Sequence, residues 1–154
     1  MSPTPTITAR EHLCTVFLRY TRTAEYGMAF ADIVSGKTSV PPQGARFDIS
    51  VEGRFQGAKL QGTFVGVDYL HIRTDGRAQM HLHHQLTTEE GEKIALSGEG
   101  VGGRDAETGQ TMVRVSASLL TASPKYAWVN SLHIWGQGET DPRTGELRVE
   151  LYSA

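Results

Sequence analysis

Cysteine is almost absent from this chain of 154 residues, in which Cys14 is the only one. A single thiol cannot form a disulfide within the chain, so we expect a reducing, cytoplasmic location. Long apolar runs are also missing, since no stretch approaches the roughly 18 residues that a membrane helix requires. Residues 1–13 have no apolar core of the signal-peptide kind, and we expect neither a signal peptide nor a membrane partner.

An excess of charge of one sign is lacking as well. The chain has 15 Lys and Arg residues against 17 Asp and Glu residues, which gives a formal net charge of −2. Nucleic-acid binders usually carry a basic patch or stripe, so we expect no nucleic-acid partner. The length fits one domain of ordinary size.

The first third of the chain is less regular than the rest. Residues 1–10, rich in Pro and Thr, predict a flexible N-terminal tail, and residues 11–154 a single domain. Residues 11–20 are rich in β-formers and predict a strand. Tyr26, Phe30 and Ile33 have helical spacing, which favours about two turns of helix, although Gly27 weakens that prediction. Residues 22–45 would then serve as a plug, a lid or a partner-facing arm.

From residue 45 onward, apolar and polar residues alternate in short runs. Phe47, Ile49 and Val51 fall on one face of the first run, as expected for a half-buried strand. The Asp75-Gly76 pair between two such runs predicts a hairpin turn. About nine strands in this pattern indicate an all-β protein. Because an open meander would leave two exposed edges, we predict a closed antiparallel up-and-down β-barrel of about 8–10 strands with at most one short helix.

The alternation divides the strand residues into two faces without saying which face lines the barrel. The apolar set comprises Phe47, Ile49, Leu60, Phe64, Leu96, Val113 and Val115, and the polar set comprises Tyr69, His71, Arg73, His81, His83 and Glu99. If the apolar set points inward, the polar set lies on the outside. A partner subunit or residues 22–45 covering the outside would enclose part of the polar set.

Several short motifs follow one another along the chain in a fixed order. They are Gly53-x-Phe55-x-Gly57-x-x-Leu60-x-Gly62, Asp68-Tyr69, Arg73-x-Asp75-Gly76, Thr121-x-x-Pro124-x-Tyr126-x-Trp128-x-Asn130 and Gly136-x-Gly138. Over residues 46–152 this order resembles the family called domain of unknown function 3237. The resemblance implies a β-barrel related to the allene oxide cyclase and dirigent barrels, which steer cyclisations or couplings without a cofactor. The family's own activity is largely unassigned, and fold alone does not assign it.

The chain also departs from the family pattern after Asp75-Gly76. His81 and His84 stand where the family usually has an acidic residue and a tyrosine. A family mechanism based on that carboxylate or phenol is therefore in doubt here.

The polar set contains the first candidate site. His71 and Arg73 share a strand face with Tyr69, and an arginine can grip a carboxylate or enolate with two parallel hydrogen bonds. The alternative is a solvated outer face on which Arg73 braces the Asp75 turn. We predict His71, Arg73 and His81 as catalytic residues, and we assign Tyr69, His83 and Glu99 to substrate binding.

His81 and His83 also form a His-x-His pair on one strand face. Such a pair can chelate a divalent metal, with His71 or Glu99 as a third ligand. The pattern is weak, and histidines that hydrogen-bond or face water are the better explanation of it. We predict no cofactor and no metal, with His81 and His83 as the alternative metal site.

Tyr126, Trp128 and Asn130 alternate along what the pattern predicts to be a strand. If their common face lines a pocket, the aromatic pair would stack a planar substrate and the carboxamide would orient its carbonyl. Plain core packing is the competing interpretation. We assign all three residues to substrate binding.

Three functional hypotheses remain open. The first is a cofactor-independent barrel enzyme, an isomerase, cyclase or lyase, that moves protons on a small aromatic or polyketide-like carbonyl compound, because imidazole titrates near neutrality. The second is a non-catalytic carrier or sensor of a small ligand, and the third is a His-based metalloenzyme. We expect a small-molecule ligand and a homodimer.

Overall fold

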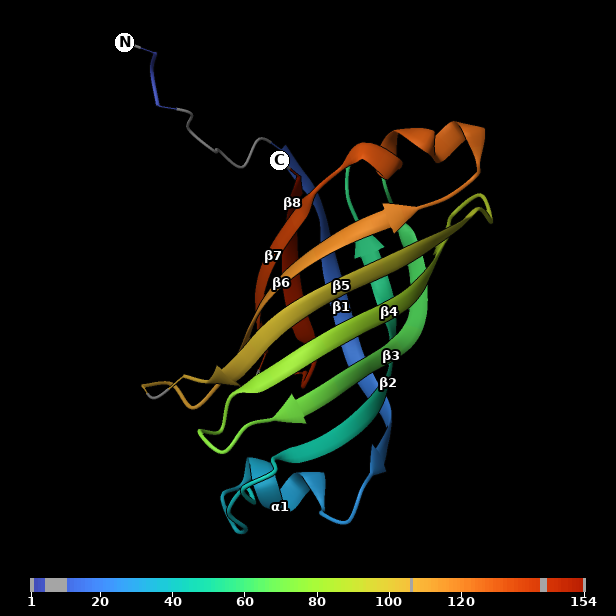
Figure 1. Ribbon diagram of the computed structural model, residues 1–154. Coiled ribbons are helices and arrows are strands. Elements are labelled where there is room, and N and C mark those ends of the chain that lie inside the picture. The colour runs from blue at the N-terminus through green and yellow to red at the C-terminus, as the bar shows by residue number, and fades with distance from the viewer. Residues whose placement is uncertain (1, 5–10, 106, 142–143, 154) are drawn as a thin grey trace.

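Eight antiparallel strands close into one barrel in the computed structural model of this protein (Figure 1). The structure describes residues 2–4, 11–105, 107–141 and 144–153, so most of the predicted tail lies outside the described residues. The elements are β1 (Glu11–Glu25), α1 (Phe30–Val34), β2 (Ala45–Gln56), β3 (Gly62–Ile72), β4 (Ala78–Thr88), β5 (Lys93–Arg104), β6 (Thr111–Leu120), the 3-10 helix η1 (Pro124–Ser131), β7 (Ile134–Thr140) and β8 (Leu147–Ser153).

The strands follow one another around the barrel in chain order. Each strand pairs with the next, and β8 returns to pair with β1, where Val16 lies opposite Val149. The predicted closed up-and-down barrel with one short helix is therefore confirmed, with eight strands. At the β3–β4 turn Gly76 has a φ of 84°, and the N–H of Arg73 bonds the carbonyl of Arg77 at 2.8 Å. The Asp-Gly hairpin prediction is thus confirmed too.

The apolar set fills the barrel. Phe47, Ile49 and Phe64 are buried inside it, and Val115 packs against that core from a partly buried position. The polar set lies on the outer face, where Tyr69 alone is partly buried. The alternation did not say which strand face lines the barrel, and the structure shows that the apolar face does. The polar set stays outside because water is the better environment for imidazole, guanidinium and carboxylate groups.

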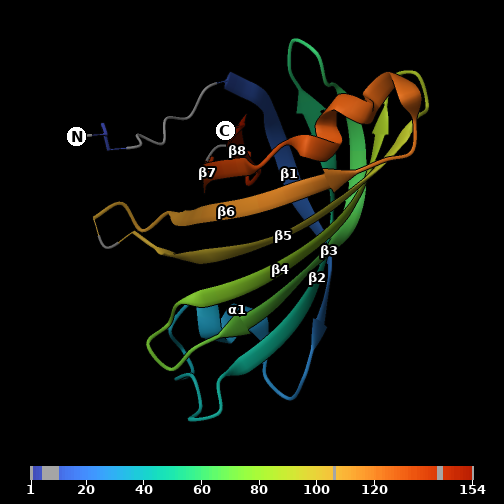
Figure 2. The same ribbon diagram turned by 45° about the horizontal axis from the view of Figure 1, so that its top comes forward.

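The two ends of the barrel are built differently. α1 lies across one end and η1, drawn in orange, across the other (Figures 1 and 2). Phe30 of α1 packs edge-to-face on Phe47 at 5.0 Å between ring centroids, which ties the helix to the barrel core. At the η1 end the side chains leave a cavity of only about 20 Å³ among residues such as Cys14 and Phe55, so that half is solid.

Two predicted boundaries near the N-terminus are wrong. β1 continues five residues past Tyr20 to Glu25, because the chain keeps pairing with β2 down to the Glu25–Phe47 pair. The helix has five residues instead of two turns. Gly27, with φ at 91°, separates Tyr26 from the helix, and this left-handed conformation cannot continue a helix.

The strand predicted across Tyr126, Trp128 and Asn130 is also wrong, because these residues form η1. Pro124 begins the turn with its fixed φ. The Asn130 side chain accepts the N–H of Thr121 at 2.8 Å and donates to its carbonyl at 2.9 Å, which draws the chain back on itself. The three residues therefore share no strand face and do not line the barrel cavity.

β3 runs without interruption through Gly66 and Val67 and pairs in register with both β2 and β4. Among the described residues no helix is long and apolar enough to cross a membrane.

Candidate active site

A histidine and an aspartate meet inside the apolar barrel. The Nε2 atom of His84 lies 2.6 Å from Oδ1 of Asp68, and their side chains are only 9% and 6% exposed. The β3–β4 register explains the meeting. Gly66 lies opposite His84 and Asp68 lies opposite Leu82, so the two polar residues are diagonal neighbours on the inward face.

The surroundings hold the imidazole in one orientation. The ring of Phe64 stacks on His84 with centroids 5.2 Å apart and planes 17° apart. The missing side chain of Gly66 provides the space, because a Cβ there would lie 2.6 Å from Cδ2 of His84. A carboxylate can only accept, so Nε2 donates its proton to Asp68 and Nδ1 keeps the lone pair in the neutral ring. This pair can act as a general base whose orientation is fixed.

Tyr20 adds a third polar group at the cavity wall, where the residue is 45% exposed. Tyr20 pairs with the buried Val51 of β2, and the register of β1 against β2 shifts just after it, between Tyr20 and Arg22. The apolar cavity wall beside the phenol, reinforced by the charge of Asp68, raises the pKa of Tyr20. The phenol therefore keeps its proton at neutral pH and acts as a hydrogen-bond donor.

A cavity of about 350 Å³ occupies the α1 end of the barrel. Its volume lies within the usual range for small-ligand pockets. Leu18, Tyr20, Leu70 and Met80 form its barrel wall, and the α1 segment contributes the remaining apolar cover with Phe30, Ile33, Val34 and Val40. Asp68 is the next inward residue of β3 beyond Leu70, so the Asp68–His84 pair lies one inward position below the residues that line the cavity.

The predicted catalytic residues lie outside this cavity. His71 and His81 are exposed on the outer face, and His81 Nδ1 lies 3.7 Å from Oε1 of Glu99. Arg73 forms a 3.0 Å ion pair with Asp75, which matches the turn-bracing alternative. The structure does not bring the three residues together in an enclosed site, and their catalytic role stays a prediction.

The predicted substrate-binding residues fall into three separate places. Tyr69 and His83 form an edge-to-face contact at 5.7 Å on the outer face, with Arg46 over the tyrosine ring. Tyr126 is buried under η1 and donates to Glu90 at 2.9 Å. Trp128, on the same helix, is 36% exposed. Asn130 anchors η1, and Glu99 pairs with His81.

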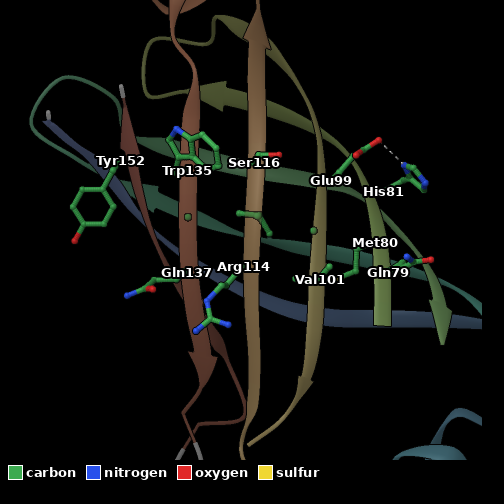
Figure 3. Close-up of a pocket in the computed structure, with 13 residues that line it drawn as sticks. Gln79, Met80, His81, Glu99, Val101, Arg114, Ser116, Trp135, Gln137 and Tyr152 are labelled. Atoms are coloured by element: carbon green, nitrogen blue, oxygen red, sulfur yellow. Dashed lines mark ion pairs between the residues drawn. The ribbon is translucent and has the colours of Figure 1, made fainter. Parts of the chain in front are cut away.

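The outer face carries a groove of its own. This open concavity of about 710 Å³ runs across β4 to β8, and Figure 3 shows its lining residues. Glu99 and His81 face each other at one side, while Arg114 and Gln137 extend from neighbouring strands near Tyr152. Two of the predicted site residues therefore line a surface groove instead of the interior.

The described residues contain no group of three or more His, Cys, Asp or Glu side chains placed to hold a metal ion. His81 and His83 both point outward with separate neighbours, Glu99 and Tyr69. The alternative metal site therefore gains no third ligand from the part of the chain that the structure describes.

Tyr20, Asp68 and His84 were not among the predicted site residues, although the alternation held a signal for Asp68 and His84. Asp68 interrupts an inward series of Phe64, Gly66, Leu70 and Ile72, and His84 stands between Leu82 and Leu86. A polar side chain in the middle of an apolar strand face must find a buried partner. That argument applies to the apolar face, which the alternation alone did not place inside or outside the barrel.

Fold and site together define a class of protein, the small closed antiparallel barrel with a ligand-sized cavity under a helical cover and polar groups at its floor. The family described as Protein of unknown function (DUF3237) matches residues 28–153, and the chain belongs to it. No curated protein matches the chain.

Solved structures with the same fold come from bacteria and a fungus. A β-barrel-like protein from Acinetobacter baumannii AYE is 21% identical over 99% of both chains, with a TM-score of 0.79. A conserved protein of unknown function from Rhodopseudomonas palustris is 17% identical over 97% of this chain and 99% of its own, with a TM-score of 0.75. An enzyme from Penicillium herquei is 18% identical over 99% of both chains, with a TM-score of 0.69.

Proposed function

We propose that this protein is an enzyme that transfers protons on a small carbonyl compound of aromatic or polyketide-like character bound inside the barrel. The observation that carries the proposal is the buried 2.6 Å contact between His84 and Asp68 below a ligand-sized cavity. The similarity in fold to an enzyme from Penicillium herquei is consistent with it. Isomerase, cyclase and lyase reactions all begin with this kind of step.

The proposed step uses the side chains of His84, Asp68 and Tyr20. The lone pair of His84 takes a proton from the carbon next to the carbonyl, and the C–H electron pair moves into the carbonyl, which becomes an enolate. Asp68 stabilises the resulting imidazolium, and Tyr20 donates a hydrogen bond to the enolate oxygen. Return of the same proton to another carbon gives an isomer, so the step requires no co-reactant. Because His84 and Asp68 do not line the cavity, the step requires the side chains at the cavity floor to move aside and admit the substrate to the imidazole.

Hydrogen exchange tests this proposal without knowledge of the product. A panel of small aromatic ketones and 1,3-diketones is incubated with the protein in D₂O, and loss of the α-proton signal is followed by NMR. We expect exchange with at least one compound. In His84→Gln the exchange rate should fall by at least about 100-fold, which is the lower bound of general-base contributions. Glutamine preserves the size and a hydrogen bond to Asp68 but cannot accept the proton.

Two further variants locate the chemistry. His133→Gln changes an exposed histidine whose ring packs edge-to-face on Trp135, and it should leave exchange unchanged. His71→Gln tests the outer-face alternative. Loss of exchange in His71→Gln with full activity in His84→Gln would move the catalytic site to the outside of the barrel and contradict the proposal.

A second candidate function is a carrier or sensor of a small apolar ligand. The observation that favours it is the cavity wall, which is mainly apolar and does not include Asp68 or His84. A carrier would give ligand-induced NMR shifts of cavity residues with no α-proton exchange, and its ligand affinity would not depend on the imidazole of His84.

A further inference from the structure

The mouth of the barrel cavity carries one cationic side chain among the described residues that line it. Arg104 ends β5, opposite Thr111, and the other lining residues are apolar, glycine or neutral polar. An exposed arginine beside an apolar cavity offers two parallel N–H donors to an anion.

The guanidinium of Arg104 has no ion-pair partner within the described part of the chain. The carboxylate next to it in sequence is engaged elsewhere. Asp105 accepts the N–H groups of Glu107 at 2.7 Å and Thr108 at 3.0 Å, and these bonds hold the pKa of Asp105 below its usual value. The arginine is therefore available to a ligand.

The length of the cavity sets the shape of such a ligand. Met80 at the cavity floor pairs with Gly100 of β5, and Arg104 lies four residues further along that strand. At about 3.3 Å per residue the two levels are about 13 Å apart. A ligand with two or three fused rings spans most of this distance, and the Arg104 side chain covers the remainder when it folds over the cavity mouth.

We propose that the cavity binds an amphipathic organic anion, with its ring-containing apolar body in the barrel and its acidic group held by Arg104 at the mouth. The carbonyl of the proposed reaction then lies at the opposite end of the ligand, toward Asp68 and His84. This assignment of ligand class deepens the proposed function and rests on it for the identity of the reacting end, while the binding claim stands on the cavity and Arg104.

Two fluorescent dyes with a shared ring system test the binding claim. 1-Anilinonaphthalene-8-sulfonate carries an anionic group, and N-phenyl-1-naphthylamine is the same body without it. Fluorescence titration of the full chain at low salt should give a lower Kd for the anionic dye. Arg104→Gln should raise that Kd about tenfold and leave the Kd of the neutral dye unchanged, whereas Arg104→Lys should recover part of the affinity.

The matched control is Arg114→Gln. Arg114 is an exposed arginine of β6 in the outer groove of Figure 3, so the variant removes the same charge from the competing site. We expect no change in either Kd. Loss of anionic-dye binding in Arg114→Gln instead of Arg104→Gln would overturn the proposal, and so would a wild-type protein that binds the anionic dye no more tightly than the neutral one.

The dye experiment and the exchange experiment fail independently. Arg104 takes no part in the proton transfer, and His84→Gln should leave the preference for the anionic dye intact. Dye selectivity through Arg104 combined with absence of α-proton exchange would support an anion carrier and contradict the enzyme.

Discussion

Single residues in this barrel differ sharply in what burial does to their chemistry. Asp68 and His84 are polar groups whose removal from water costs free energy that only a close hydrogen bond offsets. The 2.6 Å contact between them provides that compensation. Cys14 is equally buried but has no hydrogen-bonded partner group of this kind, so burial acts on the thiol alone. Its exposure is 2%.

The thiol of Cys14 should make stability fall at high pH. Burial, with a smaller contribution from the charge of Glu150, raises the pKa of Cys14 from 9.0 to about 12. Below pH 9 the thiol is protonated in both states and has no effect. Between about pH 9 and 12 only the unfolded chain loses the proton, so this residue lowers the folding equilibrium constant about tenfold per pH unit.

Chemical denaturation from pH 7 to 11 measures this effect. Cys14→Ala removes it, so the variant should show a shallower fall above pH 9 than the wild type, although it is less stable at pH 7. Equal slopes for the two proteins would contradict a raised pKa. Native Cys14 should also resist iodoacetamide at pH 8, because only the thiolate reacts.

At the scale of elements, the β3–β4 hairpin is the part of the barrel on which the candidate site depends. Its register sets Asp68 and His84 diagonally across the inward face, and Gly66 leaves the space that the imidazole fills. A Cβ at Gly66 would also lie 2.3 Å from the carbonyl oxygen of His83, which is backbone and cannot move away alone.

Gly66→Ala should therefore destabilise the barrel and displace His84. Forced overpacking of a core costs typically 1–3 kcal/mol, and thermal unfolding should show a correspondingly lower Tm. Gly103→Ala in β5 is the matched control, because a Cβ there meets nothing within 4 Å. Similar Tm values for the two variants would show that the space beside His84 is not confined.

The sequence was sufficient to predict the architecture because strand alternation, turn residues and edge closure act locally. It was less informative where a side chain overrides local preference. The bonds from Asn130 to Thr121 turn a β-rich segment into η1, and pairing with β2 prolongs β1 to Glu25. Neither effect has a signature within its own segment.

The candidate site was harder to predict because histidines on the outer face form the more visible motif. His81 and His83 attract attention as a His-x-His pair, whereas His84 gains its meaning only from Asp68 on another strand. The face on which it lies also had to be identified as the interior. Arg104 lies in no motif, and only closure of the barrel places it at the cavity mouth.

At the scale of the whole molecule, the two halves of the barrel divide stability and binding between them. The η1 half is packed, with a cavity of only about 20 Å³, while the α1 half leaves about 350 Å³ for a ligand. The polar groups Asp68 and His84 lie where these halves meet, and Tyr20 lines the cavity on the α1 side. Such a boundary offers both a rigid support and an approach from the cavity.

The closure between β1 and β8 also makes the barrel topologically a ring. Glu11 lies opposite Ser153, so the first and last strand residues are about 5 Å apart, as in any antiparallel pair. The position of the chain break is then one of eight similar cuts. A circular permutant that joins residues 11 and 153 through a short linker and opens the chain between Asp75 and Gly76 should fold to the same barrel.

Far-UV circular dichroism and cooperative unfolding of the permutant would test this equivalence. Its folding rate should change more than its spectrum. In the permutant β4 is the first strand and β3 the last, so their pairing spans the whole chain, whereas the β1–β8 pair becomes local in sequence. A permutant without cooperative unfolding would instead mean that the β3–β4 hairpin must form as one continuous unit.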